Sequence, residues 1–348
     1  MKDVISLVRP NIASLEPYST ARDEYKGEIG VLMDANENPF AGKGINRYPS
    51  TSAKDALRSK ISRMKGIPCG NIFLGNGSDE AIDLCYRIFC RPGMDNAVAI
   101  SPSYGMYGVC AEVNDVAYRP VLLRDDFSLP VDEIIAACDN NTKLVFICSP
   151  NNPTANAFPL ESILKVVEAV EAVVVVDEAY VDFSPKGSLL PVLSQHRNLI
   201  ILQTLSKAYG LAGLRVGLAF ACEDVIKIFR QVKYPYNIGT DTIELALRCL
   251  EASDAPSEIK TLVAERKRLE GILREEPCVL EVYPSDANFL LVKVTDTSGL
   301  YRSLIGAGVI VRDRSRVPLC GGCLRITVGT YEENQKLIEV IRAYGRES

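Results

Sequence analysis

Short, continuously apolar runs that alternate with helix-like segments constrain the fold of this chain more than any other feature. Two examples are LVFIC at 144–148 and AVVVVD at 172–177. A strand that is apolar at every position must be covered on both faces, as in a parallel sheet with helices on each side. We therefore expect an α/β fold in which a large, doubly wound, mainly parallel sheet domain is joined to a smaller α+β domain.

The apolar periodicity predicts the individual elements. In the first two thirds of the chain it predicts strands at 71–74, 97–101, 116–122, 143–148, 172–177 and 199–204. Between them it predicts helices at 52–64 (capped by Ser52 and closed by Gly66), 78–90, 105–113, 131–138 and 160–171. After Tyr236 the pattern changes to helix over 240–276, strands near 279–283, 288–294, 309–312 and 323–328, and a final helix from Glu332.

These changes in pattern also predict the domain boundaries. Residues 1–44 contain several prolines and little periodicity, which indicates an extended arm that also forms part of the small domain. Residues 45–239 are expected to form the large domain and residues 240–348 the small one. Arms of this kind often reach another subunit.

Composition excludes several functional classes. The chain has 348 residues, 47% hydrophobic and 24% charged, with a net charge of −5, which argues against a nucleic-acid partner. The N-terminal sequence MKDVISLVRP lacks the apolar core of a signal peptide, and apolar runs such as 172–176 are too short to cross a bilayer. We therefore expect a cytoplasmic protein without membrane contact.

The cysteines and the histidine make a metal enzyme or a Ser-His-Asp hydrolase improbable. Most of the eleven cysteines lie in apolar segments, where a reduced thiol packs as a small hydrophobe. Cys320 and Cys323 have CxxC spacing, but no second pair accompanies them. The single histidine, His196, lies in a polar stretch and is expected at the surface. No metal site is predicted.

Lys207 is the strongest candidate for the chemical centre. It follows the apolar strand at 199–204, and an amine in such a partly buried setting has a lowered pKa and can act as a nucleophile that forms a Schiff base. Thr204 and Ser206 lie beside it, and Arg215 follows among glycines that would let a phosphate approach. Taken alone, a lysine after a strand is usually only a solvated charge.

Polar residues also follow other predicted strands, where α/β sheets bind their ligands. GNGSDE at 75–80 begins a helix whose free N–H groups suit a phosphate, although alone it reads as a capping motif. SPNNPTA at 149–155 presents Asn152 in a rigid turn. VVVVDEAYVDF ends a strand with Asp177, which needs a cationic partner if it is buried, and then adds Tyr180. SPSYGMY at 101–107 holds Tyr104, which alone would be a core residue but could stack on a flat ring.

In this order and spacing the motifs resemble those of fold-type I, pyridoxal-phosphate-dependent aminotransferases, and most closely the histidinol-phosphate aminotransferase family. The resemblance covers nearly the whole chain. It also includes NENPF at 36–40, RYP at 47–49, TLSKAYGLAGLRVG at 204–217 and CLRITVGT at 323–330.

The resemblance implies a pyridoxal 5′-phosphate site. Lys207 would bind the cofactor covalently and move a proton, Asp177 would pair with the pyridinium nitrogen, and Tyr104 would stack on the ring. Asn152 and Tyr180 would hydrogen-bond the phenolic oxygen. The phosphate would be held by residues of three segments, with one more residue from a partner subunit in a homodimer: Ser78, Asp79, Glu80, Ser206, Arg215 and the partner's Tyr48. Thr204 would be a further cofactor-binding residue.

The resemblance also implies the substrates. Arg325, assisted by Arg312, would bind the phosphate of histidinol phosphate and the carboxylate of glutamate in turn, while Tyr18 and Asn36 would enclose the substrate. The implied reaction converts histidinol phosphate and 2-oxoglutarate into imidazole-acetol phosphate and glutamate, and in the opposite direction it is a step of histidine biosynthesis.

Alternatives remain open at the level of sequence. An aromatic amino acid aminotransferase, or an enzyme like threonine-phosphate decarboxylase, would keep the cofactor and change the substrate. A non-catalytic regulatory protein of the same fold is a third reading, but the chain retains Lys207 and has no added DNA-binding segment. Two departures from the family pattern are Ala155, where glycine is usual, and Tyr209, which would add a hydroxyl near Lys207.

Overall fold

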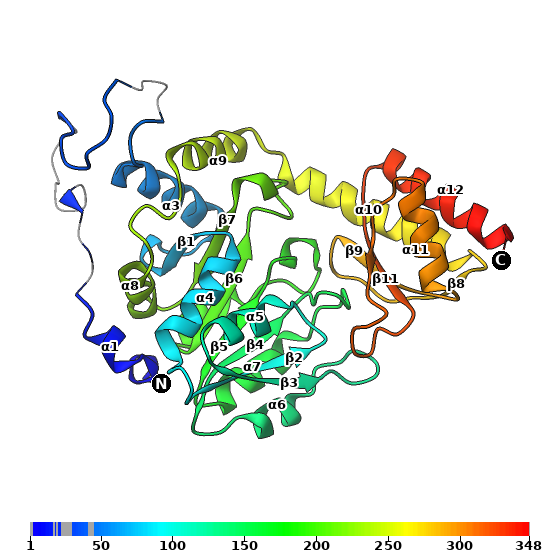
Figure 1. Ribbon diagram of the computed structural model, residues 1–348, viewed down its shortest axis with the longest axis horizontal. Helices are drawn as coiled ribbons and strands as arrows, with labels where there is room; N and C mark the ends of the chain where they lie inside the picture. Colours follow the sequence, from blue (N-terminus) through cyan, green and yellow to red (C-terminus); the bar gives the residue numbers. More distant parts are fainter. Residues whose placement is uncertain (1–2, 17, 19, 22–29, 41–44, 348) are drawn as a thin grey trace.

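A computed structural model describes residues 3–16, 18, 20–21, 30–40 and 45–347 of the chain. Figure 1 shows two separate sheets, a large one surrounded by helices and a small one near the C-terminus. The large sheet comprises seven strands, in the spatial order β1-β7-β6-β5-β4-β2-β3, and the small sheet four, in the order β10-β11-β9-β8. The predicted fold class is therefore confirmed.

The large sheet is mainly parallel. Its strands are β1 (Ile72–Asn76), β2 (Asn96–Ser101), β3 (Ala117–Leu122), β4 (Thr142–Cys148), β5 (Val173–Asp177), β6 (Leu199–Thr204) and β7 (Val216–Phe220). All neighbouring pairs from β6 to β3 are parallel, whereas β7 runs antiparallel to both β1 and β6. Because the parallel strands point the same way, the residues that follow them meet at one edge.

The central strand β5 shows why the apolar runs are continuous. Side chains alternate across a strand, so Val174 and Val176 face one core while Val173 and Val175 face another. The first core is covered by α3 (Thr51–Lys65), α6 (Val131–Ala137), α7 (Leu160–Ala169) and α9 (Thr240–Ala252). The second is covered by α4 (Ser78–Phe89), α5 (Met106–Val113) and α8 (Glu223–Val232). Both faces of the sheet are thus buried, as the sequence predicted.

Several element boundaries differ from the prediction. Helix α3 is capped by Ser50, whose Oγ accepts from the Ala53 N–H at 3.1 Å, and not by Ser52. Gly66 ends this helix in the left-handed conformation, as predicted. The segment predicted as helix over 240–276 is two helices, α9 and α10 (Ala255–Arg274), because Pro256 can begin a new helix but cannot continue one. Strand β7 and helix α8 were not predicted.

The small sheet is entirely antiparallel. Its strands are β8 (Val279–Val282), β9 (Phe289–Val294), β10 (Arg312–Asp313) and β11 (Cys323–Thr327). Its core is shared with α10, α11 (Thr297–Gly306) and α12 (Tyr331–Glu347). Helix α11 was not predicted, since its glycines weaken the helical pattern. The helices that cover the sheet are apolar on one side only, and among the described residues no helix has the length and apolarity that a membrane span requires.

The N-terminal segment is only partly an extended arm. A short turn of helix, η1 (Val4–Leu7), and α1 (Pro10–Ala13) pack on the large domain, where Val4 and Val8 are buried. The Arg9 N–H donates to the Ile88 carbonyl at 2.9 Å and fixes this contact. The prediction of an extended arm is therefore wrong for residues 4–13. The described residues at 30–40 and 45–49 form no helix or strand and run along the outside of the molecule (Figure 1).

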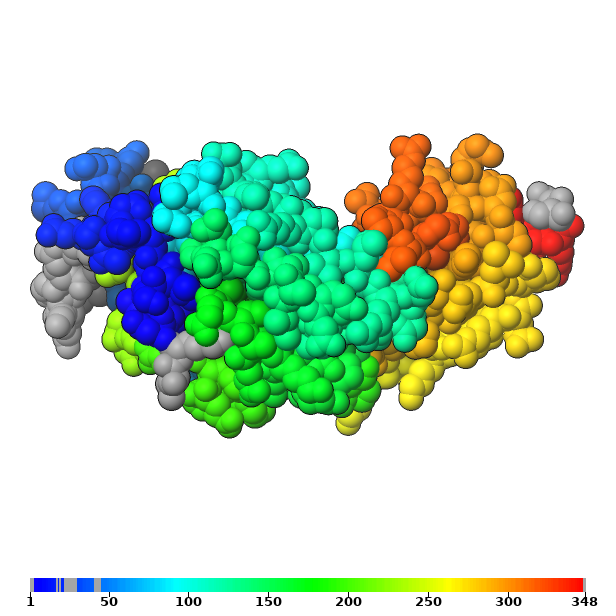
Figure 2. Space-filling view, turned by 90° about the horizontal axis from the view of Figure 1, so that it is seen from below, coloured from blue at the N-terminus to red at the C-terminus, as the bar shows by residue number. Residues whose placement is uncertain are grey.

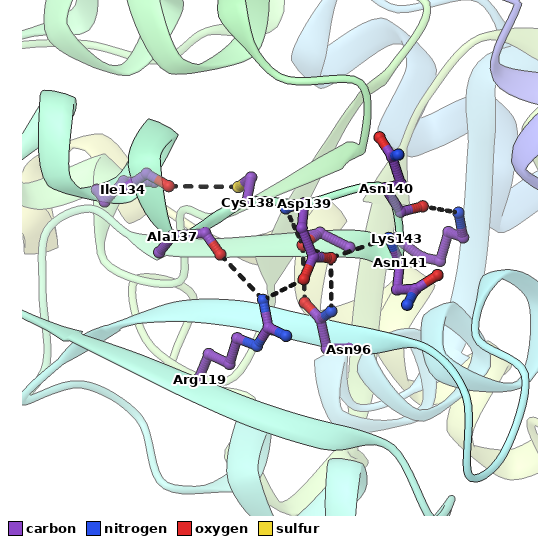
Figure 3. Close-up of polar contacts among 10 residues, drawn as sticks. Asn96, Arg119, Ile134, Ala137, Cys138, Asp139, Asn140, Asn141 and Lys143 are labelled. Atoms are coloured by element: carbon purple, nitrogen blue, oxygen red, sulfur yellow. Dashed lines mark hydrogen bonds and ion pairs between the residues drawn. The ribbon is translucent and has the colours of Figure 1, made fainter.

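A polar network joins the amino ends of the parallel strands (Figure 3). The Asp139 carboxylate, just before β4, accepts from Asn96 of β2 at 2.9 Å and from Arg119 of β3 at 2.7 Å. The Thr142 hydroxyl donates to Asn96 at 2.7 Å, and the Asn141 N–H donates to Asp139. The Asn96 and Arg119 hydrogen bonds hold the pKa of Asp139 well below its usual range. At this edge of the sheet the buried polar groups and the Asp139 charge thus have hydrogen-bond partners within the protein.

The two sheets meet beside the opposite edge. The Asp286 carboxylate, before β9, accepts from the Ala157 N–H at 2.9 Å and lies 3.4 Å from Lys186 Nζ. A small apolar cluster, in which Tyr180 and Phe289 pack edge to face at 5.1 Å, continues the contact. In Figure 2 the C-terminal part of the chain, yellow to red, is set off from the rest by a notch in the surface.

Candidate active site

A pocket lies at the carboxyl edge of the large sheet, where β1, β4, β5 and β6 end. It is lined by Gly77, Ser78, Asp79, Tyr104, Cys148, Asn152, Asp177, Ala179, Tyr180, Thr204, Ser206, Lys207 and Arg215. Most of the residues singled out in the sequence are therefore brought together, although they lie far apart in the chain.

Lys207 lies in the turn after β6. The Gly210 N–H donates to the Lys207 carbonyl at 3.1 Å, and the Leu211 N–H donates to the Leu205 carbonyl at 3.0 Å. Backbone hydrogen bonds therefore hold the turn in place. Burial lowers the pKa of Lys207, the positive charges of Arg325 and Arg215 lower it further, and Asp177 opposes this. The side chain still opens into the pocket, so its amine is accessible and has more neutral character than an ordinary lysine.

Asp177 is the buried carboxylate of the pocket, with 3% of its surface exposed. The Tyr107 hydroxyl donates to its Oδ2 at 2.8 Å and the Ala179 N–H donates to its Oδ1 at 3.1 Å. Burial raises the pKa of Asp177 to about 6 despite these two donors. A buried carboxylate with a raised pKa is suited to a cationic ligand that would restore its charge.

Three polar side chains surround the space between Lys207 and Asp177. The Tyr104 hydroxyl donates to Asp79 at 3.0 Å, which fixes its ring at the pocket wall. Tyr180 lies with its ring centroid 5.7 Å from Lys207 Nζ, and burial raises its pKa. Asn152 Oδ1 accepts from Arg325 Nη1 at 2.5 Å. A flat ligand in this space would meet an aromatic face and two hydrogen-bonding groups.

The part of the pocket at the start of α4 fits a phosphate group. Helix α4 begins there with Gly77 as its N-cap and no side-chain cap, so its first N–H groups are available to a ligand. The Ser206 Oγ is buried and has no hydrogen-bond partner among the described residues. A Cβ on Gly77 would lie 2.5 Å from Arg215 Nη2, so only glycine leaves this cradle open.

Gly217 makes the cradle possible. A Cβ there would lie 2.1 Å from the Gly77 carbonyl carbon and 2.2 Å from the Ser78 nitrogen, because the backbone that follows β1 lies directly against Gly217. Arg215, in the left-handed conformation before β7, has its Nη2 3.4 Å from Asp79 Oδ2. An orphaned hydroxyl, a free helix N-terminus and an accessible guanidinium thus converge on one space.

Thr204 and Glu80, which the sequence also predicted for the cofactor site, are engaged in hydrogen bonds with the protein itself. Thr204 Oγ1 donates to the Val216 carbonyl at 3.3 Å and accepts from the Ser206 N–H at 3.1 Å, so it shapes the turn that carries Ser206. Glu80 is not among the lining residues. Its carboxylate accepts from Asn237 at 3.0 Å and from the Asn76 N–H, which fixes the loop before α4.

The predicted substrate arginines lie at the junction with the small sheet. Arg325 on β11 pairs in register with Arg312 on β10. Arg325 lies over the Phe289 ring at 5.4 Å, and its buried Nε has no hydrogen-bond partner among the described residues. Burial lowers the pKa of Arg325, and the charges of Arg314 and Arg312 lower it further. This cationic face is open to an anion.

Three predicted residues lie elsewhere in the chain's own structure. Tyr48 stacks on Tyr236 with centroids 4.1 Å apart, and it lines a second pocket together with Asn36. The arm holds this region through Glu37, whose carboxylate lies 2.7 Å from Arg47 Nη1. Tyr18 is 78% exposed. None of the three lines the Lys207 pocket of the same chain.

The structure also resolves the two sequence departures. Ala155 has φ of +69°, the left-handed conformation that a glycine adopts more easily, so the turn keeps the geometry expected for glycine. Its methyl group packs in the apolar cluster with Tyr180 and Phe289. Tyr209 does not face Lys207: its ring lies 5.4 Å from Lys65 Nζ.

Sequence reasoning missed Tyr107 and Arg314. Tyr107 belongs to the SPSYGMY motif one helical turn after Tyr104, and its fully buried hydroxyl orients Asp177. Its apolar surroundings gave no signal of a polar role. Arg314 lies two residues after Arg312, and alternation along a strand would place both on the same face, but the predicted strand ended at residue 312.

Comparison with known proteins identifies the class. The model of the family "Aminotransferase class I and II" matches residues 21–341. The chain belongs to this family, and it is an aminotransferase with pyridoxal 5′-phosphate as the implied cofactor. The fit of the pocket to a flat ring with a phosphate agrees with that cofactor.

Individual relatives narrow the class. The chain is 51% identical to the histidinol-phosphate aminotransferase of Bacteroides fragilis, over 99% of this chain and 100% of that protein. Its fold is similar to the solved histidinol-phosphate aminotransferase of Clostridium acetobutylicum, with a TM-score of 0.80 and 22% identity over 88% of this chain and 92% of that one. It is also similar to the enzyme of Sinorhizobium meliloti in complex with pyridoxal-5′-phosphate, with a TM-score of 0.77 and 23% identity over 87% and 84% of the two chains.

Proposed function

We propose that the protein transfers the amino group between histidinol phosphate and 2-oxoglutarate, giving imidazole-acetol phosphate and glutamate, and that the opposite direction of this reaction is its step in histidine biosynthesis. The proposal depends mainly on the position of Arg325. This guanidinium can bind an anion, since it has no carboxylate partner among the described residues, and it donates a hydrogen bond to Asn152, which lines the Lys207 pocket. The full-length similarity to histidinol-phosphate aminotransferases supports the same conclusion.

The pocket residues have separate roles in this proposal. Pyridoxal phosphate supplies a carbonyl carbon that bonds to amines and a ring that withdraws electrons. Lys207 would hold the cofactor at that carbon, and its free amine would take the proton from the substrate Cα. Its lowered pKa favours the neutral form of the amine that this role needs. Asp177 would hold a proton on the ring nitrogen, and the hydrogen bond from Tyr107 fixes the carboxylate in place.

The other proposed cofactor contacts are supported by the lining of the pocket. Tyr104 would stack on the ring, while Asn152 and Tyr180 would hydrogen-bond its phenolic oxygen. The backbone at Ser78, Asp79 and Glu80 would bind the phosphate at the start of α4. Ser206 and Arg215 complete this cradle from the other side, and Thr204 holds the Ser206 turn.

At the substrate end, Arg325 and Arg312 bind the phosphate of histidinol phosphate in one half-reaction and the carboxylate of glutamate in the other. A guanidinium suits both anions because each offers two oxygens to its planar fork. The position of Arg325 next to Asn152 would couple substrate binding to the cofactor's phenolic side.

We propose a cytoplasmic homodimer in which the arm completes the partner's site. Tyr48 and Asn36 line a pocket at the outside of the chain, and the same segment exposes apolar side chains such as Val31 and Phe40. In the dimer Tyr48 would contact the partner's cofactor phosphate, and Tyr18 and Asn36 would enclose its substrate. We also propose the division into an arm at 1–44, a large domain at 45–239 and a small domain at 240–348. The two separate sheets support two domains, although α9, at the start of the proposed small domain, packs on the core of the large sheet.

Mixed dimers test the shared site. Lys207→Ala and Tyr48→Phe chains, each weakly active alone, should regain activity when they are mixed, because one of the two sites in a hybrid then carries both native residues. A protein that sediments as a monomer would contradict the proposal.

The substrate is tested by single-turnover reactions of the holoenzyme. Histidinol phosphate, histidinol, phenylalanine and threonine phosphate are compared as substrates, with 2-oxoglutarate as the acceptor. We expect histidinol phosphate to react fastest. Equal rates for histidinol and its phosphate would remove this assignment and favour an aromatic aminotransferase, whereas carbon dioxide release from threonine phosphate would favour the decarboxylase.

A further inference from the structure

Arg314 is a cation near the substrate end of the site that the proposed mechanism does not use. It directly follows β10, and its N–H donates to the Cys323 carbonyl at 2.9 Å, so the β10–β11 ladder continues to this residue. Side chains two residues apart on a strand share a face. Arg314 therefore lies on the face that carries Arg312, and Arg312 pairs in register with Arg325.

Among the described residues, the Arg314 side chain has no hydrogen-bond or ion-pair partner that would explain its burial. Its guanidinium is half-buried, its Nε is fully buried without a hydrogen-bond partner, and no carboxylate in the described part of the chain forms an ion pair with it. Arg325 has an unpartnered buried Nε as well. Buried guanidinium groups without partners are costly unless an anion meets them.

Arg314 is also electrostatically coupled to the site. Burial and the charge of Arg312 lower its pKa, while Cys320 and Tyr180 act in the opposite direction. Among the charges that lower the pKa of Arg325, that of Arg314 is the largest. The three arginines are thus close enough to repel one another, and both Arg314 and Arg325 interact electrostatically with Tyr180, which lines the Lys207 pocket.

We propose that Arg314 is a third arginine of the substrate-anion site and selects substrates that carry a phosphate dianion. A phosphate monoester carries nearly two charges at neutral pH, whereas a carboxylate carries one. Two arginines suffice for a carboxylate, and a third favours the dianion over it. This inference rests on the proposed function and specifies which half-reaction depends on which cation.

The test compares Arg314→Gln with a matched control, Arg316→Gln, two residues further along and exposed. In the holoenzyme, Arg314→Gln should lower kcat/KM for histidinol phosphate by about 10-fold or more, while kcat/KM for glutamate changes less than about 3-fold. Arg316→Gln should leave both unchanged. Arg314→Lys should restore part of the loss, because it keeps a charge without the planar fork.

Binding of inorganic phosphate gives a readout that does not depend on turnover. Phosphate should protect wild-type holoenzyme and Arg316→Gln against thermal unfolding more than it protects Arg314→Gln. Without phosphate, Arg314→Gln should be at least as stable as the wild type, because it loses an unpartnered cation.

The outcomes separate the two proposals. If the wild type does not distinguish histidinol phosphate from histidinol, the proposed function fails. If it does, and Arg314→Gln keeps the full preference and the full protection by phosphate, the assignment of Arg314 fails while the proposed function stands. Equal losses for histidinol phosphate and glutamate would also overturn the assignment, because Arg314 would then not select the dianion.

Discussion

The two edges of the large sheet differ in how their charges are balanced. At the amino edge, Asp139 is surrounded by donors and its pKa is lowered (Figure 3). At the carboxyl edge, the pKa of buried Asp177 is raised, that of Lys207 is lowered, and the Ser206 hydroxyl has no partner among the described residues. One edge is organised for stability, and the other keeps unsatisfied groups that a ligand can complete. Strain and unmet charge of this kind are typical of functional sites.

The largest expected effect is at Asp177. Asp177→Asn should lower turnover by at least about 100-fold, because a neutral amide no longer holds a proton on the ring nitrogen. Near wild-type turnover would contradict the role of Asp177.

The same substitution should stabilise the cofactor-free protein. The folded-state pKa of about 6 lies above the value near 4 of an exposed aspartate, so ionised Asp177 destabilises the fold as pH rises through this range. At neutral pH, Asp177→Asn should therefore gain about 2 to 3 kcal/mol in the free energy of unfolding, and the gain should shrink towards about pH 4. Urea unfolding at several pH values measures it, and a loss of stability would show that Asp177 is structural.

The second expected effect is at Arg325. Arg325→Lys should weaken both half-reactions by about 10- to 100-fold in kcat/KM, since loss of a charge-assisted hydrogen bond costs roughly 1.5 to 3 kcal/mol. Single-turnover rates with histidinol phosphate and with glutamate measure the two effects separately. Arg316→Lys, an exposed change in the neighbouring loop, serves as the control. A loss confined to one substrate would mean that Arg325 does not bind both anions.

The smallest expected effect on activity is at the amino edge. Asp139→Asn should lower Tm at neutral pH, because the hydrogen bonds from Asn96 and Arg119 stabilise the ionised carboxylate. Its pKa is lowered, so this stabilisation is present above about pH 4 and is lost as pH falls below that value. Turnover should not change. Asp125→Asn, at an exposed position, is the control, and a loss of turnover in Asp139→Asn alone would contradict the separation of the two edges.

The sequence predicted the parts of this comparison that depend on local pattern. Continuous apolar runs such as β5 indicated a parallel sheet, and the polar residues after them, Asp177 and Lys207, indicated the functional edge. Strand β7 was missed because its glycine obscures the pattern, although that glycine is what lets β7 approach the Gly77 backbone.

Other parts of the site depend on long-range contacts and could not be predicted. Tyr107 reads as a core residue, and only the fold brings its hydroxyl to Asp177. The burial of Arg314 depends on the pairing of β10 with β11, which a two-residue strand does not reveal in the sequence. Arg325 was predicted from its motif, but its hydrogen bond to Asn152 joins residues 173 positions apart.

The most direct test of the account is to locate the lysine that binds the cofactor. Purified protein is reduced with borohydride, which makes the bond between pyridoxal phosphate and its lysine permanent, and the labelled peptide is then mapped. The account predicts a label on Lys207 and no labelling in Lys207→Ala. A label on another lysine, such as Lys233 or Lys65, would contradict the assignment of the carboxyl edge as the active site.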